Sequence, residues 1–147
     1  ERLGATGISL GGIVSSIVVS VDPEARSGAL LLAGGDLAHV LWEMPETAPF
    51  RKDWEAQGKT VADLKSLTDP YDPLTYASGL AGKRVLMIAG NVDEVIPPAS
   101  ARALWEAGGR PPILWYDCGH YSAAGFLLPA LRRAVEFLGG EDPPPAP

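Results

Sequence analysis

The sequence predicts an α/β fold in which a mostly parallel sheet is flanked by helices. A short apolar run, a turn and a helical pattern follow one another four times along the 147 residues, which is the order of βα units. The apolar runs are continuous, as in strands that are buried on both faces. The 17 glycines and 14 prolines provide many turns. A chain of this length is enough to build one hydrophobic core.

Composition and charge exclude several classes of protein. The chain has 12 basic and 18 acidic residues and a formal net charge of −6, so it lacks the basic surface that binds nucleic-acid phosphates. Leu3 to Val21 carries no charge, but its closely spaced glycines indicate a buried strand and helix rather than a membrane span. The single Cys118 cannot form an internal disulfide, and the cytoplasm is the default compartment. We expect no cofactor. We also expect no metal, because there are too few histidines and the carboxylates do not cluster at ligand spacing.

The first βα unit begins almost at the start of the sequence. We expect a strand over Leu3–Thr6, a sharp turn over Gly7–Gly11 and a helix over Leu10–Val21. The apolar run Ala29–Ala33, which ends at two glycines, predicts the second strand. Since the apolar run starts at the second or third residue and the first residue is Glu1, we expect a fragment or a processed product.

The middle of the chain, from Asp36 to Leu80, is less regular and predicts either a lid or plain packing. Two helices are expected in it, near Thr60–Leu67 and Pro73–Ser78. Its aromatic side chains suggest either the wall of an apolar acyl pocket or ordinary core: Trp42, Phe50 and Trp54, together with Met44.

The remaining units are regular. The expected elements are a strand over Arg84–Ala89, a helix from Pro97-Pro98 through Ala107, a strand over Ile113–Tyr116 and a helix over Ala123–Leu138 that Pro129 kinks. We expect one domain over residues 1–140 and an extended Pro-rich tail over 141–147.

A serine lies at the turn between the first strand and the first helix. The stretch Gly7-Ile8-Ser9-Leu10-Gly11 matches G-x-S-x-G, and glycine is expected on both sides of Ser9 because so tight a turn leaves little room for side chains. The Ser9 hydroxyl would project above the carboxyl edge of the sheet. There the backbone N–H of Leu10, at the helix N-terminus, would stabilise an oxyanion. The alternative is a glycine-rich turn with a bystander serine.

A nucleophilic serine needs a histidine base that a carboxylate orients. His120 follows the fourth strand at the same sheet edge as Ser9, whereas His39 is better explained by packing or as a pocket wall. Asp93, three residues beyond the third strand, is the first choice for the carboxylate, and Asp36 is its competitor. The nearby Glu94 and Asp117 are interpreted as solvated loop carboxylates, and Cys118 as a small core residue.

In their order, the motifs GISLGG, LLLAGGD, VLMIAGNVDEVIPP and WYDCGHYS resemble the carboxyl-terminal half of the α/β-hydrolase fold family. The resemblance covers Leu3 to Leu138 and is strongest to esterase-like and dienelactone-hydrolase-like members. It implies a partial α/β-hydrolase fold, the last four strands starting at the nucleophile strand. It also implies a Ser-His-Asp triad of Ser9, His120 and Asp93 that cleaves an ester or related acyl compound through an acyl-enzyme.

The chain departs from this family by lacking the earlier strands and the loop that supplies the other oxyanion N–H. The Ser9 strand is therefore expected to be an exposed apolar edge. Either an amino-terminal half, as another chain or as another part of the same protein, covers it, or two copies pair edge to edge as a homo-oligomer. Two other functions stay open: a non-catalytic association module, and thioesterase, peptidase, lactonase or acyltransferase chemistry on the same triad.

Overall fold

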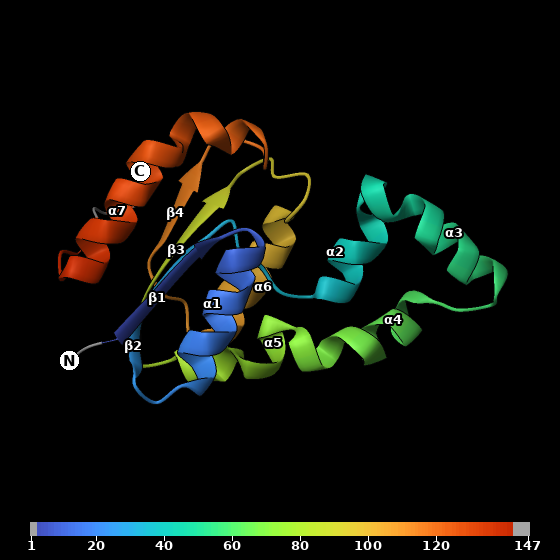
Figure 1. The fold of residues 1–147 in the computed structure, drawn as a ribbon, viewed down its shortest axis with the longest axis horizontal. Helices are drawn as coiled ribbons and strands as arrows, with labels where there is room; N and C mark the ends of the chain where they lie inside the picture. The colour runs from blue at the N-terminus through green and yellow to red at the C-terminus, as the bar shows by residue number, and fades with distance from the viewer. Residues whose placement is uncertain (1–2, 143–147) are drawn as a thin grey trace.

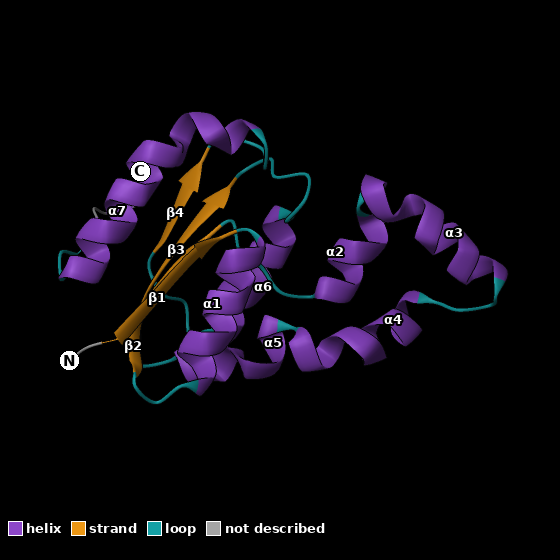
Figure 2. Ribbon diagram, viewed as in Figure 1, coloured by secondary structure: helices purple, strands orange, loops and turns teal. Residues whose placement is uncertain are grey.

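A computed structural model describes residues 3–142, and it shows a four-stranded sheet covered by helices on both faces (Figures 1 and 2). The strands are β1 (Leu3–Ile8), β2 (Ala25–Leu31), β3 (Arg84–Gly90) and β4 (Ile113–Tyr116). They are all parallel and lie in the order β1-β2-β3-β4. The predicted α/β class with a parallel sheet is confirmed.

Helices cover the two faces of the sheet unequally. One face packs on α7 (Leu127–Gly139), and the other on α1 (Leu10–Val21), α5 (Pro73–Tyr76) and α6 (Pro98–Ala107), as Figure 1 shows. No helix within residues 3–142 is both long and apolar enough to cross a membrane.

Successive side chains of a strand point to opposite faces, so the continuous apolar runs supply two cores. Leu30 and Met87, which are register partners, belong to the core on the α1 side. Leu31 and Ile88, the next pair, belong to the core on the α7 side with Phe137. The buried sheet holds the carboxyl ends of the strands at one edge, where the candidate site lies.

The bounds of the first two strands differ from the prediction. β1 continues beyond Thr6, because Ile8 still pairs with Leu31 of β2. β2 begins at Ala25 rather than Ala29, and the exposed Arg26 at its start hides the strand pattern. It ends before the predicted Ala33, because Leu32 has a φ of 47°, which is not extended backbone.

The segment from Asp36 to Leu80 is more helical than predicted, and in Figure 1 part of it projects to one side of the sheet. Helices α2 (Leu37–Glu43) and α3 (Ala48–Ala56) were not predicted. Helix α2 has only seven residues and buries Ala38 and Val40, and α3 buries no residue, so neither helix shows a long apolar stripe. Helix α4 (Val61–Thr68) lies near the predicted Thr60–Leu67 and begins at a capping box, and α5 is shorter than predicted. Short 3-10 turns connect these helices: Pro45–Thr47, Asp69–Tyr71 and Ala77–Leu80.

The aromatic residues of this segment lie outside the two cores of the sheet. Phe50 and Trp54 pack on one another along α3, with ring centroids 4.9 Å apart. Met44 packs against a small cluster of Ile13, Val40 and Ile96. Ordinary sheet core is therefore the wrong explanation for Phe50 and Trp54.

The last helix is divided rather than kinked. A 3-10 turn over Ser122–Phe126 precedes α7, and Pro129 occupies the third position of α7, where its missing N–H leaves no hydrogen bond unmade. Helix α7 ends at Gly139, and Gly140 follows with a φ of 111°. The next residues contact Arg84, whose guanidinium donates to the Glu141 carbonyl and the Asp142 carboxylate. Residues 143–147 of the predicted tail lie outside the described residues.

Asp72 ties the start of the helical segment to α5. Its buried carboxylate accepts the N–H groups of Asp36 (3.1 Å), Leu37 (2.6 Å) and Leu74 (2.9 Å). Asp72→Ala would leave these donors without partners, and we expect it to lower the free energy of unfolding by about 3 kcal/mol in urea denaturation. Asp69→Ala, which removes an exposed carboxylate paired with Lys65, should cost less than about 1 kcal/mol. Equal losses in the two variants would contradict this role of Asp72.

Candidate active site

Ser9 occupies a single-residue turn between β1 and α1. Its φ of 56° and ψ of −120° lie in a region that side chains other than glycine rarely adopt. A Cβ at position 7 would lie 2.3 Å from the backbone of Gly11, and one at position 12 would lie 2.6 Å from the Leu31 carbonyl oxygen. Position 11 has nothing within 4 Å of a built Cβ, so the expectation that glycine is needed there for lack of side-chain room is wrong.

The structure brings Ser9, His120 and Asp93 together at the carboxyl edge of the sheet. Ser9 Oγ lies 2.9 Å from His120 Nε2, and His120 Nδ1 lies 2.9 Å from Asp93 Oδ2 and 3.1 Å from Oδ1. An ionised carboxylate only accepts hydrogen bonds, so the proton of the neutral imidazole belongs on Nδ1. His120 Nε2 is then free to accept the proton of the Ser9 hydroxyl.

Asp93 is held by the turn that follows β3. Its carboxylate is buried, and Oδ1 accepts the backbone N–H groups of Val95 (2.9 Å) and Ile96 (2.7 Å). These bonds fix the carboxylate and leave Oδ2 directed at the imidazole. Because Asp93 has its own backbone partners, it can orient His120 without moving.

Asp36, the competing carboxylate, has a different partner. It lies 2.8 Å from His39 Nδ1, three residues further along α2. His39 is exposed and borders a surface hollow that Asp36, Val40 and Ser100 also line. Asp36 and His39 thus form a second, separate pair, and the geometry favours Asp93 for His120.

Glu94 has a contact that sequence reasoning missed. Its Oε2 accepts the backbone N–H of His120 at 2.9 Å, although the sequence suggested a solvated carboxylate. Hydrogen bonding to this N–H is the main reason that the pKa of Glu94 lies below its ordinary value, and the Tyr121 N–H and the charge of His120 act in the same direction. The only sequence signal for this contact is that two acidic residues, Asp93 and Glu94, follow β3 side by side.

Tyr121 links the His120 loop to the helical segment. Its ring packs edge-on against His120 at a centroid distance of 5.7 Å, and its hydroxyl donates to Glu46 Oε1 at 3.3 Å. The negative charge of Glu46 is the largest cause that raises the pKa of the Tyr121 phenol. This exposed contact places the segment after Met44 beside the candidate site.

The start of α1 adds an anion-stabilising feature. Leu10 is the first residue of this helix, where backbone N–H groups have no partner within the helix and the helix dipole is positive. The Ser9 carbonyl accepts the Ile13 N–H, which starts the helical hydrogen bonding directly after the turn. The Leu10 N–H therefore lies at the helix N-terminus directly after Ser9.

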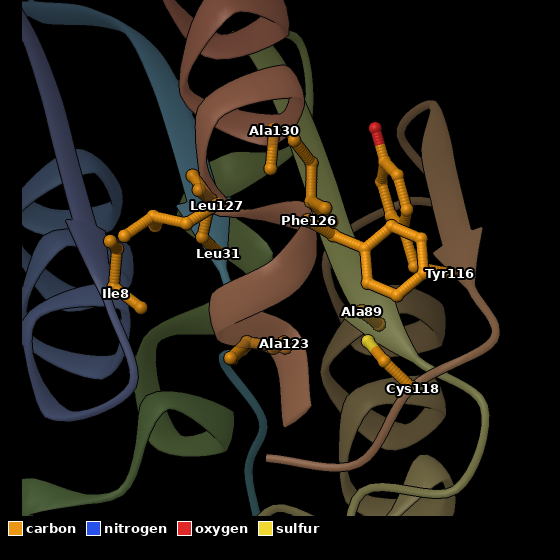
Figure 3. Close-up of a pocket in the computed structure, with 11 residues that line it drawn as sticks. Ile8, Leu31, Ala89, Tyr116, Cys118, Ala123, Phe126, Leu127 and Ala130 are labelled. Atoms are coloured by element: carbon orange, nitrogen blue, oxygen red, sulfur yellow. The ribbon is translucent and has the colours of Figure 1, made fainter. Parts of the chain in front are cut away.

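An apolar hollow lies beneath the site on the α7 side of the sheet (Figure 3). It is lined by Ile8 and Leu31 from the strands, by Cys118, and by Phe126 and Leu127 at the start of α7, among other apolar residues. Its volume is about 30 Å³. Burial is the main cause that raises the pKa of the Cys118 thiol, which disfavours its thiolate form.

No group of three or more His, Cys, Asp or Glu side chains within residues 3–142 is arranged to hold a metal ion.

Comparisons with known proteins place the chain among sequence relatives of uncharacterised function. No family model matches the sequence. Over 102 residues it is 31% identical to the uncharacterised protein YdjC of Bacillus subtilis, a match that covers 69% of this chain and 85% of YdjC. Over 141 residues it is also 31% identical to the uncharacterised protein Rv2627c of Mycobacterium tuberculosis H37Rv, covering 91% of this chain but 31% of that protein.

Solved structures show which fold this is. An esterase of Pyrococcus furiosus matches with a TM-score of 0.65 and 18% identity, covering 94% of this chain and 53% of the esterase. A puromycin-hydrolysing peptidase of Mycobacterium tuberculosis matches with a TM-score of 0.71 and 18% identity, covering 94% of this chain and 22% of that chain. The enol-lactonase of Burkholderia xenovorans matches with a TM-score of 0.59 and 19% identity, covering 94% of this chain and 66% of that chain.

The parallel sheet flanked by helices agrees with these matches. The chain has the α/β-hydrolase fold of these structures and, at the level of sequence, belongs to the same family as YdjC. It spans about half the length of the esterase and less than a third of Rv2627c.

Proposed function

We propose that the chain carries the active site of a serine hydrolase that cleaves a carboxylic ester or a related acyl compound. The observation that supports this most is the continuous hydrogen-bonded chain from Ser9 through His120 to Asp93, with both contacts at 2.9 Å. Solved structures of the same fold include an esterase, a peptidase and an enol-lactonase, which agrees with acyl chemistry.

The proposed reaction has two steps. In the first, Ser9 Oγ attacks the acyl carbon while His120 Nε2 takes its proton, and the leaving alcohol departs with that proton as the acyl-enzyme forms. In the second, a water molecule gives a proton to His120 and attacks the acyl carbon, which releases the acid and returns the proton to Ser9. Asp93 holds the imidazole and stabilises its positive charge in both steps.

The Leu10 N–H is proposed as one donor to the oxyanion of the tetrahedral intermediate. A second donor, opposite Leu10, would come from a segment that lies against β1. Loss of one such donor typically slows catalysis about 10²–10³-fold, so the state of the β1 edge matters for activity.

A fluorophosphonate probe tests the proposal directly. Ser9 Oγ is expected to displace fluoride from phosphorus, and intact mass and peptide mapping should find the adduct on Ser9. His120→Ala should abolish labelling, whereas His39→Ala, which changes the other pair, should leave it unchanged. A folded wild-type sample without adduct would contradict the hydrolase proposal and favour the association module.

The class of acyl substrate is tested separately, because thioesterase, peptidase, lactonase and acyltransferase activities all use the same triad. We propose ester hydrolysis first and expect turnover of short p-nitrophenyl esters. A thioester, a peptide p-nitroanilide or a lactone that is cleaved more than about tenfold faster would reassign the reaction.

The exposed side of β1 and α1 is proposed to bind a further polypeptide segment. In the described sheet β1 pairs with β2 alone, and Leu3, Ile8, Val14 and Val18 are exposed beside this edge. Unpaired apolar strands associate readily. Light scattering should show a mass above 15.4 kDa if two copies pair, and a monomer that binds an amino-terminal half if that half is the partner.

A further inference from the structure

We propose that Glu94 is a positioning residue for His120: its carboxylate holds the backbone of His120 while the neighbouring Asp93 holds the imidazole. The inference rests on the proposed function. It starts from the contact of Glu94 Oε2 with the His120 N–H at 2.9 Å and assigns it a role in the reaction.

The two loops that carry these residues are paired only near the strands. Asn91 N–H donates to the Tyr116 carbonyl at 2.8 Å, and Val92 N–H donates to the Cys118 carbonyl at 3.2 Å. This backbone pairing has ended by the time the chain reaches His120. The Glu94 carboxylate continues it, because it accepts the next available N–H across the gap between the loops.

Fixing the backbone and the ring at once defines where Nε2 points. A histidine whose ring alone is held can still shift as its loop moves, because two side-chain torsions separate the ring from the backbone. Asp93 Oδ2 binds Nδ1 at 2.9 Å and Glu94 Oε2 binds the backbone N–H at 2.9 Å, so both ends of the residue are held. A shift of about 1 Å at a reacting atom can slow catalysis about 10²-fold.

Gly119 provides the room for this contact. A Cβ at position 119 would lie 2.3 Å from Glu94 Oε2. Gly119 has no positive φ, so its backbone would also suit alanine, and the Glu94 carboxylate is the group that a Cβ would meet first, followed by the Val92 carbonyl oxygen at 3.2 Å. Gly119→Ala therefore displaces the Glu94 carboxylate without changing any charge.

The test is a set of variants in which labelling of Ser9 by the fluorophosphonate is followed over time. Glu94→Ala should lower the maximal labelling rate constant about 10–100-fold with little change in the half-saturating probe concentration, because positioning acts on the reaction and not on binding. Glu94→Gln should stay within about threefold of wild type, because its amide oxygen can still accept the N–H.

Gly119→Ala completes a double-mutant cycle with Glu94→Ala. It should slow labelling about tenfold in the wild type and less than about threefold when Glu94 is already alanine, because the displaced group is then absent. Asp117→Asn is the matched control, because it removes an exposed carboxylate from the loop that carries His120. The Asp117 side chain makes no hydrogen bond to any residue in 3–142. It should change labelling less than about twofold.

Amide hydrogen exchange gives a readout that does not depend on activity. Exchange at the His120 N–H should be faster in Glu94→Ala and near wild type in Glu94→Gln. Equal labelling in Glu94→Ala and Asp117→Asn, or an unchanged exchange rate at His120, would overturn the inference. Wild type that is not labelled at Ser9 would instead overturn the proposed function, and this exchange measurement would still decide whether Glu94 holds the His120 loop.

Discussion

Ser9→Ala should lower ester hydrolysis about 10⁴-fold or more and abolish the fluorophosphonate adduct. The hydroxyl is the proposed nucleophile, and its hydrogen bond is to His120 Nε2 at 2.9 Å. Members of a triad act as a unit, so losing the nucleophile removes nearly the whole contribution of the triad. The measurement is the initial rate on a p-nitrophenyl ester together with the intact mass after labelling.

The fold should survive this substitution. Alanine has the same backbone restrictions as serine at a φ of 56°, so the free energy of unfolding should change by less than about 1 kcal/mol. Ser66→Ala, on the exposed face of α4, is the control for a serine outside the site. Hydrolysis that persists at the wild-type rate in Ser9→Ala would show that another group, or a contaminant, is responsible.

The fold was predictable from sequence where one physical signal dominates. The apolar stretches Ala29–Leu31 and Val85–Ala89 lie in strands and are buried on both faces, and hydrophobicity alone marks such stretches. Helices α2 and α3 were not predictable in this way, because α3 buries no residue and the start of α2 is held by the contacts of Asp72 with the Asp36 and Leu37 N–H groups. A contact between residues 35 or 36 positions apart leaves no local pattern.

The candidate site also has one part that the sequence predicts and another that it does not. Ser9 and Asp93 follow β1 and β3 and His120 follows β4, and parallel strands bring their carboxyl ends to one edge, so their meeting could be predicted. The contact of Glu94 with the His120 backbone could not, because it depends on the path of two loops and on the space left at Gly119. Nor did the G-x-S-x-G pattern show that Gly7 and Gly12, rather than Gly11, are the positions without room for a Cβ.

Asp93→Asn should lower the rate of ester hydrolysis about 10⁴-fold, far more than Asp36→Asn. An asparagine can keep its amide oxygen on the Val95 and Ile96 N–H groups, but its NH₂ group then faces His120 Nδ1. The imidazole proton would move to Nε2, the wrong tautomer for accepting the proton of Ser9, and an exchange of this kind costs about 10⁴-fold in serine proteases. The measurement is kcat for the same p-nitrophenyl ester.

Asp36→Asn is the matched control, because it makes the same chemical change in a carboxylate that pairs with His39 instead. We expect a change of less than about threefold, since the exposed Asp36–His39 pair does not contact His120. The two variants together separate orientation of the base from a general effect of removing negative charge near the sheet edge. A larger loss in Asp36→Asn than in Asp93→Asn would reassign the orienting carboxylate to Asp36 and would require the His120 loop to rearrange in the active protein.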